Sequence, residues 1–372
     1  MKDLVDKYDA VALMSGGLDS ILAMRTIMDQ GLKVLGLHFY SPFFGHPELI
    51  EHWQKIYGIE IKSFDIGDDL LNLLKIGPKH GFGACLNPCT DCHILMIKKA
   101  KEIMKEIHAK FIISGEVIWQ RPMSQRPDTM NIIHRDSETK DILLRPLCAL
   151  WLEPTPMENS GLVDRQRLLK ISGRGRSEQL ELANKYGFTE IPMPGGGCVL
   201  TEQKSTARFW KILESFTKPN AEDFALAQAG RFFTHDGFML AISKRQGDAK
   251  VLNKIVRPTD LCLELVGQAG PLALGRSEKP WDEEKIFEAA SLMASYATKT
   301  ISLVGEGKAL KVSVKLNGEE KIINVLPKRE SIFKEPSWEE TTAALKAFNQ
   351  ARLEERKQYK REKFLNWIPR KK

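Results

Sequence analysis

The chain has 372 residues, of which 42% are hydrophobic and 28% are charged, and this composition excludes a disordered or fibrous protein. The length exceeds one ordinary hydrophobic core and predicts two domains with a smaller third piece. No run reaches the roughly 18 apolar residues of a membrane span. The residues that follow Met1 include acidic ones and no apolar signal segment, so we expect a cytoplasmic protein without membrane partners.

The net charge of +7 is concentrated at one end of the chain. Residues 352–372 contain nine Lys or Arg and three Glu, so they carry six of the seven net positive charges. A basic tail on a nearly neutral body suits a polyanionic partner. A solvated terminal helix would account for the same charges, and composition alone does not decide between the two interpretations.

The N-terminal half alternates predicted strands and helices. Residues 9–14 predict a buried strand, 21–28 a helix and 33–40 a second strand, which together form a parallel βαβ unit. The pattern continues with a helix at 47–56, a strand at 60–64, a helix at 92–108 and a strand at 110–114. This alternation predicts an α/β fold with a doubly wound parallel sheet, in which ligands bind at the carboxyl ends of the strands.

The remainder of the chain is less regular. Residues 120–160, rich in Pro, Arg and Met, predict an irregular excursion, and a helix is expected at about 176–186. The following segment, 192–198, has three consecutive glycines and ends in Cys198, which indicates a backbone that approaches another group closely.

A change of pattern near 217–221 predicts a domain boundary. Beyond it we expect short strands over 230–266, a helix over 282–298 and a hairpin over 309–325 with Asn317-Gly318 at its turn. The predicted domains are therefore an α/β domain over 1–217, a smaller α+β domain over 221–335, and a basic helical tail over 336–372.

The segment Ser15-Gly16-Gly17-Leu18-Asp19-Ser20 lies between the first predicted strand and helix. The glycines allow positive φ and inward-facing N–H groups, the helix N-terminus favours an anion, and the two serines add hydroxyl donors. Asp19 suits a bridging Mg²⁺ better than a direct phosphate contact. No Lys follows the glycines, which excludes a Walker loop. The competing interpretation is a tight turn with Asp19 as a helix cap.

Three of the six cysteines, Cys85, Cys89 and Cys92, lie in one short run. Cys89 and Cys92 are spaced Cys-x-x-Cys at a predicted helix start, where the helix dipole is expected to lower thiol pKa values. Such a pair suits a metal or an iron–sulfur cluster, and Cys198 is a plausible third ligand. Three protein ligands would leave one iron of a four-iron cluster open.

Other interpretations of the cysteines remain open. Cys85 as a fourth ligand would make a closed zinc site. Cys92 and Cys198 could instead form a redox or persulfide pair without a metal. In the remaining interpretation, the cysteines are buried thiols with a structural role only.

These motifs resemble the PP-loop ATP pyrophosphatases, with an adenine nucleotide alpha hydrolase-like fold, and within them the tRNA thiouridine synthases. Ser15–Ser20 and the run His38–Pro42, which contains Ser41, resemble the nucleotide pocket of the 4-thiouridine synthetase branch. The segment from Gly115 to Gln125 resembles the part near the adenine and α-phosphate. Asn87-Pro88-Cys89-x-x-Cys92 resembles the 2-thiouridylase motif, in the cysteine-triad form of the cluster-dependent enzymes.

The resemblance covers residues 8–215 and implies a tRNA sulfurtransferase. It would use ATP and Mg²⁺ to adenylate a uridine carbonyl oxygen, release AMP and pyrophosphate, and insert sulfur delivered by a [4Fe-4S] cluster. The expected catalytic residues are Asp19, Cys92 and Cys198. The expected nucleotide ligands are Ser15, Gly16, Gly17, Asp19, Ser20, His38, Ser41, Gly115 and Gln125, and the expected cluster ligands are Cys89, Cys92 and Cys198.

The expected partners are tRNA and a sulfur donor, either free sulfide or a cysteine desulfurase. Trp119 and Trp210 are candidates for stacking on a splayed base. The general frequency of two-fold assemblies favours a homodimer. The sequence does not choose between 2-thio and 4-thiouridine. Two alternatives stay open: a PP-loop ligase or amidating enzyme that acts on a small molecule and holds zinc, and an RNA-binding protein with a non-catalytic nucleotide fold.

Overall fold

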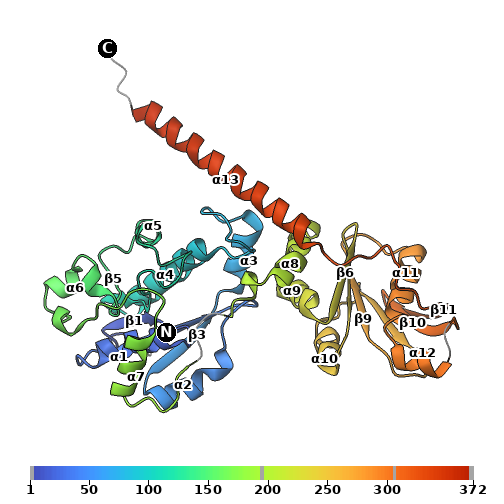
Figure 1. The fold of residues 1–372 in the computed structure, drawn as a ribbon, viewed down its shortest axis with the longest axis horizontal. Helices are drawn as coiled ribbons and strands as arrows, with labels where there is room; N and C mark the ends of the chain where they lie inside the picture. The colour runs from blue at the N-terminus through green and yellow to red at the C-terminus, as the bar shows by residue number, and fades with distance from the viewer. Residues whose placement is uncertain (1–3, 193–196, 305–306, 368–372) are drawn as a thin grey trace. The chain divides into compact units, whose positions relative to one another are not determined.

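The computed structural model describes residues 4–192, 197–304 and 307–367 (Figure 1). The chain divides into two compact units. The first comprises Met1–Gly83, Asn87–Val199 and Ala351–Lys372, and the second comprises Ala84–Leu86 and Leu200–Gln350. The boundary expected at 217–221 lies within the second unit, and the three-domain division remains a prediction.

The first unit contains a five-stranded sheet in the order β3-β2-β1-β4-β5, and every neighbouring pair is parallel (Figure 1). The strands are β1 (Ala10–Leu13), β2 (Val34–Tyr40), β3 (Glu60–Asp65), β4 (Phe111–Ile113) and β5 (Leu143–Leu144). Because β1 lies in the middle and the chain winds outward in both directions, this sheet confirms the predicted doubly wound α/β fold.

Besides short 3-10 helices and the end of the C-terminal helix, seven α-helices accompany this sheet among the described residues of the first unit. They are α1 (Leu18–Met28), α2 (Ile50–Tyr57), α3 (Gly67–Ile76), α4 (Cys89–Glu106), α5 (Pro127–Ser137), α6 (Pro156–Asn159) and α7 (Ser177–Lys185). The expectation of an irregular excursion over 120–160 was wrong, because α5 and β5 lie there. Pro127 occupies the first turn of α5, where its missing N–H costs nothing, so it starts a helix and does not break one.

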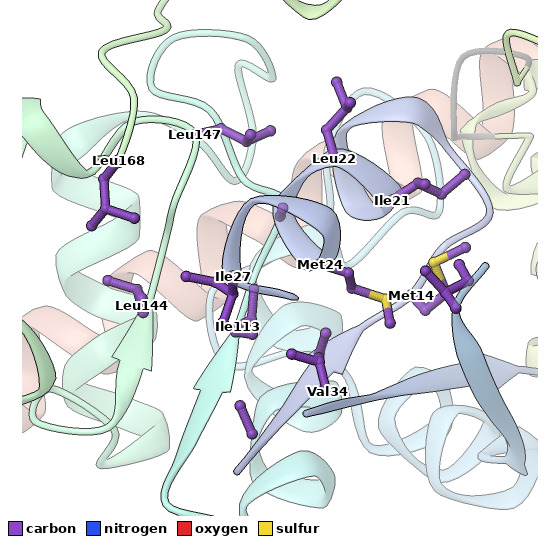
Figure 2. Close-up of a cluster of buried hydrophobic side chains, with 14 of the residues drawn as sticks. Met14, Ile21, Leu22, Met24, Ile27, Val34, Ile113, Leu144, Leu147 and Leu168 are labelled. Carbon is purple, nitrogen blue, oxygen red and sulfur yellow. The ribbon is translucent and has the colours of Figure 1, made fainter. Parts of the chain in front are cut away.

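The alternation of side chains along β1 builds a core on each face of the sheet. Ala10 and Ala12 pack with the apolar side of α1, and Val11 packs in the other core with residues of α4. Figure 2 shows side chains of the α1 core, among them Ile27, Val34 and Ile113. Burying each large aliphatic side chain contributes about 1.5–3 kcal/mol. The two cores hold the ends of β1 and α1 at fixed positions.

The second unit contains a separate antiparallel sheet in the order β11-β10-β8-β9-β7-β6. Its strands are β6 (Arg231–His235), β7 (Phe238–Ile242), β8 (Leu261–Leu265), β9 (Ala273–Arg276), β10 (Leu310–Leu316) and β11 (Glu319–Val325). Asn317 and Gly318 have φ of +52° and +83°, as a two-residue hairpin turn requires, so the predicted hairpin is confirmed.

Helices complete the second unit and begin the tail. They are α8 (Gln203–Ser215), α9 (Ala221–Gln228), α10 (Gln246–Ile255), α11 (Glu283–Ala294), α12 (Thr298–Val304) and α13 (Trp338–Trp367). The single helix expected over 282–298 ends at Ala294, and α12 begins four residues later. Within the described parts of the chain, none of the helices combines the length and apolarity that crossing a membrane would need.

Candidate active site

Ser15, Gly16 and Gly17 connect the end of β1 to the start of α1. Gly16 has a φ of +80°, and a Cβ at this position would lie 2.4 Å from the Trp53 ring, so only glycine fits. The Ser20 hydroxyl donates to the Gly17 carbonyl over 2.7 Å and accepts from the Ser15 N–H over 3.3 Å. These bonds fix the loop at the N-terminus of α1, where the dipole favours a bound anion.

Asp19 lies in the first turn of α1. One carboxylate oxygen accepts from Gln120 Nε2 over 3.0 Å, whereas Asp19 Oδ1 and Gln120 Oε1 have no hydrogen-bond partner among the described residues. Burial raises the pKa of Asp19, and this effect is only partly offset by Gln120, Arg176, the nearby Gln179 amide and Arg121. The unsatisfied oxygens of the Asp19 carboxylate and of the Gln120 amide fit a hard cation such as Mg²⁺.

Gly115, at the end of β4, lies directly against the start of α1. A Cβ at Gly115 would lie 2.7 Å from the carbonyl group of Asp19, so any larger residue would push the strand and the helix apart. Gln125 is buried further along the same segment, and its Oε1 has no partner in the described chain. The structure thus brings Gly115 to the Ser15–Ser20 loop. Among the described residues, no hydrogen bond joins Gln125 to Asp19.

Residues 115–125 are bonded to two parts of the site. At one point Gln120 holds Asp19, as described above. At another, the Met123 carbonyl accepts from the Thr90 hydroxyl over 3.3 Å, and Thr90 lies between the two cysteines of α4. Residues 115–125 therefore connect the Ser15–Ser20 loop to the first turn of α4, which carries Cys89 and Cys92.

His38 is fully buried at the end of β2, and the protein itself uses both of its ring nitrogens. Nδ1 lies 2.9 Å from the Met14 carbonyl, and Nε2 accepts from the His46 N–H over 2.9 Å. Burial lowers the pKa of His38, which favours the neutral ring with its proton on Nδ1. The side chain thus supports the loop after β1 and offers no ring nitrogen to a nucleotide.

Ser41 belongs to a turn that follows β2. Its hydroxyl accepts from the Phe43 N–H over 3.2 Å, and its own N–H donates to the Phe44 carbonyl. The Phe43 carbonyl in turn accepts from the Val199 N–H over 3.1 Å, immediately after Cys198. This bond anchors the chain next to Cys198 beside the turn, although residues 193–196 of the glycine-rich loop lie outside the described part of the chain.

Cys89 and Cys92 both lie in the first turn of α4. Burial raises the pKa of the Cys92 thiol, and Cys198, Cys89 and Asp91 add to the shift in that order. The prediction that the helix dipole lowers the thiol pKa was therefore wrong for Cys92, because burial and the neighbouring groups raise this pKa by more. The same interactions show that the third cysteine, Cys198, lies near the pair despite its distance in sequence.

The thiols lie near one another without forming a complete metal site. In residues 4–192, 197–304 and 307–367, no three His, Cys, Asp or Glu side chains are grouped closely enough to hold a metal ion. The chemistry of the donors still fits a cationic centre, because a buried thiolate needs a compensating positive charge. Cys85 is buried in the short segment that groups with the second unit, and its role stays open.

A buried ionic network beside Cys92 was not predicted from the sequence. Arg145 Nε donates to Glu116 over 2.7 Å, and His93 Nδ1 lies 2.9 Å from the other carboxylate oxygen. Arg145 also hydrogen-bonds His134. Burial would raise the pKa of Glu116, but Arg145 and His93 hold it well below its usual range. The signal available in the sequence was the position of Glu116 just past the predicted strand at 110–114, whereas no strand was predicted before Arg145.

The fold and the site define the class: a doubly wound α/β domain in which one segment connects the Gly- and Ser-rich loop after β1 to the cysteines at the start of α4. Residues 6–153 match the family model of ThiI, described as thiamine biosynthesis protein. A curated relative, the probable tRNA sulfurtransferase of Thermococcus kodakarensis, is 30% identical over 149 residues. The alignment covers 38% of this chain and 37% of the relative, so the chain spans little more than a third of that protein's length.

Solved structures also match, with low overall similarity. A predicted subunit of tRNA methyltransferase from Methanocaldococcus jannaschii is 15% identical over 37% of this chain and 68% of that one, with a TM-score of 0.28. The U34-tRNA thiolase NcsA from Methanococcus maripaludis, solved with its [4Fe-4S] cluster, is 19% identical over 51% of this chain and 61% of that one, also with a TM-score of 0.28. At these TM-scores the two matches do not bear on the site.

Proposed function

We propose that this protein is an ATP-dependent tRNA sulfurtransferase that replaces a uridine carbonyl oxygen with sulfur. The observation that carries the proposal is the connection between the phosphate loop and the cysteines. Gln120 bonds Asp19, and Met123 of the same segment bonds Thr90 between Cys89 and Cys92. An enzyme that activates an oxygen with ATP and then replaces it needs both groups at one place.

The ThiI match and the curated relative support the proposal for residues 6–153. The relative is named a probable tRNA sulfurtransferase, and the transfer of that activity to this chain is part of the proposal. A cytoplasmic location, a homodimer, and free sulfide or a cysteine desulfurase as the sulfur donor remain predictions.

In the first half of the reaction, the loop Ser15–Ser20 holds the phosphates of ATP through its N–H groups and hydroxyls. Asp19, oriented by Gln120, would hold Mg²⁺, which would supply positive charge to the phosphates. The uridine carbonyl oxygen attacks the α-phosphorus, the bond to the β-phosphate breaks, and pyrophosphate leaves. The residues of the chain contribute positioning and charge stabilisation and form no covalent bond to the nucleotide.

In the second half, the activated carbon accepts sulfur and AMP leaves with the former carbonyl oxygen. A [4Fe-4S] cluster, when bound, would supply an iron with an open position for sulfide. Cys89, Cys92 and Cys198 would hold it, because Cys89 and Cys198 both act electrostatically on Cys92 within one unit. The network of Glu116, Arg145 and His93 keeps the neighbouring turn of α4 fixed while sulfur is transferred.

The decisive test uses protein purified without oxygen, as wild type and as Cys198→Ala. Iron, acid-labile sulfide and zinc are measured, and thiouridine is sought by mass spectrometry in unmodified tRNA transcripts incubated with ATP and sulfide. We expect iron and sulfide in the wild type, their loss in the variant, and thiouridine only with the wild type. A fully active Cys198→Ala enzyme would exclude this mechanism.

Other results would point to the alternatives. Bound zinc without iron, together with ATP turnover that needs no RNA, would favour a ligase acting on a small molecule. RNA binding without any release of pyrophosphate would favour a non-catalytic nucleotide fold.

A further inference from the structure

Trp119 combines an unfavourable backbone with an exposed side chain. Its φ is +67°, a left-handed conformation that bulky residues rarely adopt. The residue is 54% exposed, and its side chain forms no hydrogen bond or ring contact with any residue that the structure describes. Neither burial nor bonding of the indole therefore accounts for a tryptophan at this position.

The surroundings of Trp119 fix its backbone from several sides. The Ile118 carbonyl accepts from the Gly173 N–H over 2.7 Å, and the Trp119 N–H donates to the Gln125 carbonyl over 2.8 Å. The next residue, Gln120, holds Asp19. Disfavoured backbone conformations persist only where the surroundings determine them, and they concentrate at sites that hold ligands.

Trp119 lies in the segment that is bonded both to Asp19 and to the start of α4, where Cys89 and Cys92 lie. It precedes the residue that bonds Asp19 and belongs to the segment whose Met123 carbonyl bonds Thr90, between the two cysteines. Arg121 and Arg176 act electrostatically on Asp19, so positive charge is available for a nucleic-acid backbone close by. An exposed aromatic ring near basic groups is the arrangement that binds unstacked bases.

We propose that Trp119 is a positioning residue that stacks on the pyrimidine base to be modified, in a single-stranded or splayed-out segment of RNA. This inference rests on the proposed function and adds to it the side chain that holds the target base. A flat ring suits this task because it accepts the base face without a directional bond, while the phosphate loop remains free for ATP.

The test compares Trp119→Asn with Trp119→Phe. Asn tolerates positive φ and removes the ring, whereas Phe keeps a stacking surface. Trp151→Asn is the matched control, since Trp151 is 52% exposed on the same unit but bonds the Lys170 carbonyl through its indole. Affinity for a labelled short oligouridylate, affinity for ATP, and the thermal unfolding midpoint are measured for each full-length variant.

We expect Trp119→Asn to bind oligouridylate about 5- to 150-fold more weakly, the range for loss of one stacked base. Its unfolding midpoint should stay unchanged or rise, because the strained backbone relaxes, and its affinity for ATP should be unchanged. Trp119→Phe should retain most of the RNA affinity, and Trp151→Asn should retain all of it. A purely structural Trp119 would instead lower the unfolding midpoint on replacement.

Three results would overturn the inference: unchanged RNA affinity in Trp119→Asn, an equal loss in Trp151→Asn, or a loss confined to ATP, which would assign the ring to adenine. Thiolation by the wild type with unaltered RNA affinity in Trp119→Asn would remove this inference and leave the proposed function intact. RNA binding that depends on Trp119, without any formation of thiouridine, would support the stacking role of Trp119 and remove the proposed function.

Discussion

At the scale of single residues, burial shifts the pKa values of several groups of the site toward the neutral form. It raises the pKa of the Asp19 carboxyl and of the Cys92 thiol, and it lowers the pKa of the His38 ring. Burial therefore disfavours the anionic forms of Asp19 and Cys92, and a cation bound beside either group would stabilise them. For Asp19 and Cys92, this effect of burial supports the proposed Mg²⁺ ion and the proposed metal cluster.

Replacement of Asp19 by Asn should separate catalysis from stability. Because the folded pKa of Asp19 is raised, its charge opposes folding as the pH rises through that pKa. Asp19→Asn should therefore be as stable as the wild type or more so at neutral pH, while pyrophosphate release falls by about 10²- to 10³-fold. Denaturant unfolding and a pyrophosphate assay check the two expectations, and a variant with full activity would refute the role of Asp19.

His134 should make the stability depend on pH. Burial and the adjacent Arg145 lower its pKa from 6.5 to about 4, so the unfolded chain takes up a proton in this window and the folded chain does not. Stability should therefore fall as the pH drops from about 6.5 to 4, by at most about 3 kcal/mol. His134→Gln should reduce this dependence in denaturant unfolding at several pH values, whereas the exposed His52→Gln should leave it in place.

At the scale of secondary-structure elements, the buried network of Glu116, Arg145 and His93 is assembled where β4, β5 and α4 meet. Glu116 follows β4, Arg145 follows β5, and His93 lies in the first turns of α4. The two buried charges lock the ends of two neighbouring strands together. The sequence predicted a strand before Glu116 but none before Arg145, and the pairing depends on the sheet order, which brings β4 and β5 side by side.

Removal of Arg145 should destabilise the first unit strongly. Arg145→Met leaves the Glu116 carboxylate buried without its guanidinium partner and with only His93 beside it, and breaking such a buried pair costs about 3–5 kcal/mol. The double variant Glu116→Gln with Arg145→Met should recover part of this loss in denaturant unfolding. Arg167→Met, which breaks an exposed pair with Asp29, should cost less than about 1 kcal/mol. Equal costs for the buried and the exposed pair would contradict this account.

At the scale of the whole molecule, the charge of the tail is the feature most directly related to RNA. Residues 356–372 contain eight Lys or Arg and one Glu. Replacement of these eight residues by Gln should weaken tRNA binding and flatten its dependence on salt concentration, because the slope is proportional to the number of phosphates that the protein neutralises. Binding titrations over a range of salt concentrations test this, with thiolation at saturating tRNA as the control. An unchanged slope would show that the tail does not bind RNA.

The local patterns of the sequence determined much of the fold. The βαβ alternation predicted the parallel sheet, and Asn317-Gly318 predicted the hairpin, because periodicity and turn chemistry involve residues that are close in the chain. The same holds for the shape of the Ser15–Ser20 loop, whose glycine and serine bonds are local. A prediction from local composition also failed: the Pro, Arg and Met content of residues 120–160 predicted an irregular segment, whereas Pro127 starts α5.

Only the tertiary structure decided which distant residues share the site. Packing on the sheet brings Gln120 to Asp19 and Cys198 to Cys92, and it occupies both ring nitrogens of His38. It also raises the Cys92 pKa where the helix terminus alone would lower it. The physical reason is that proximity and burial depend on how elements far apart in sequence pack together, and no spacing along the chain encodes that by itself.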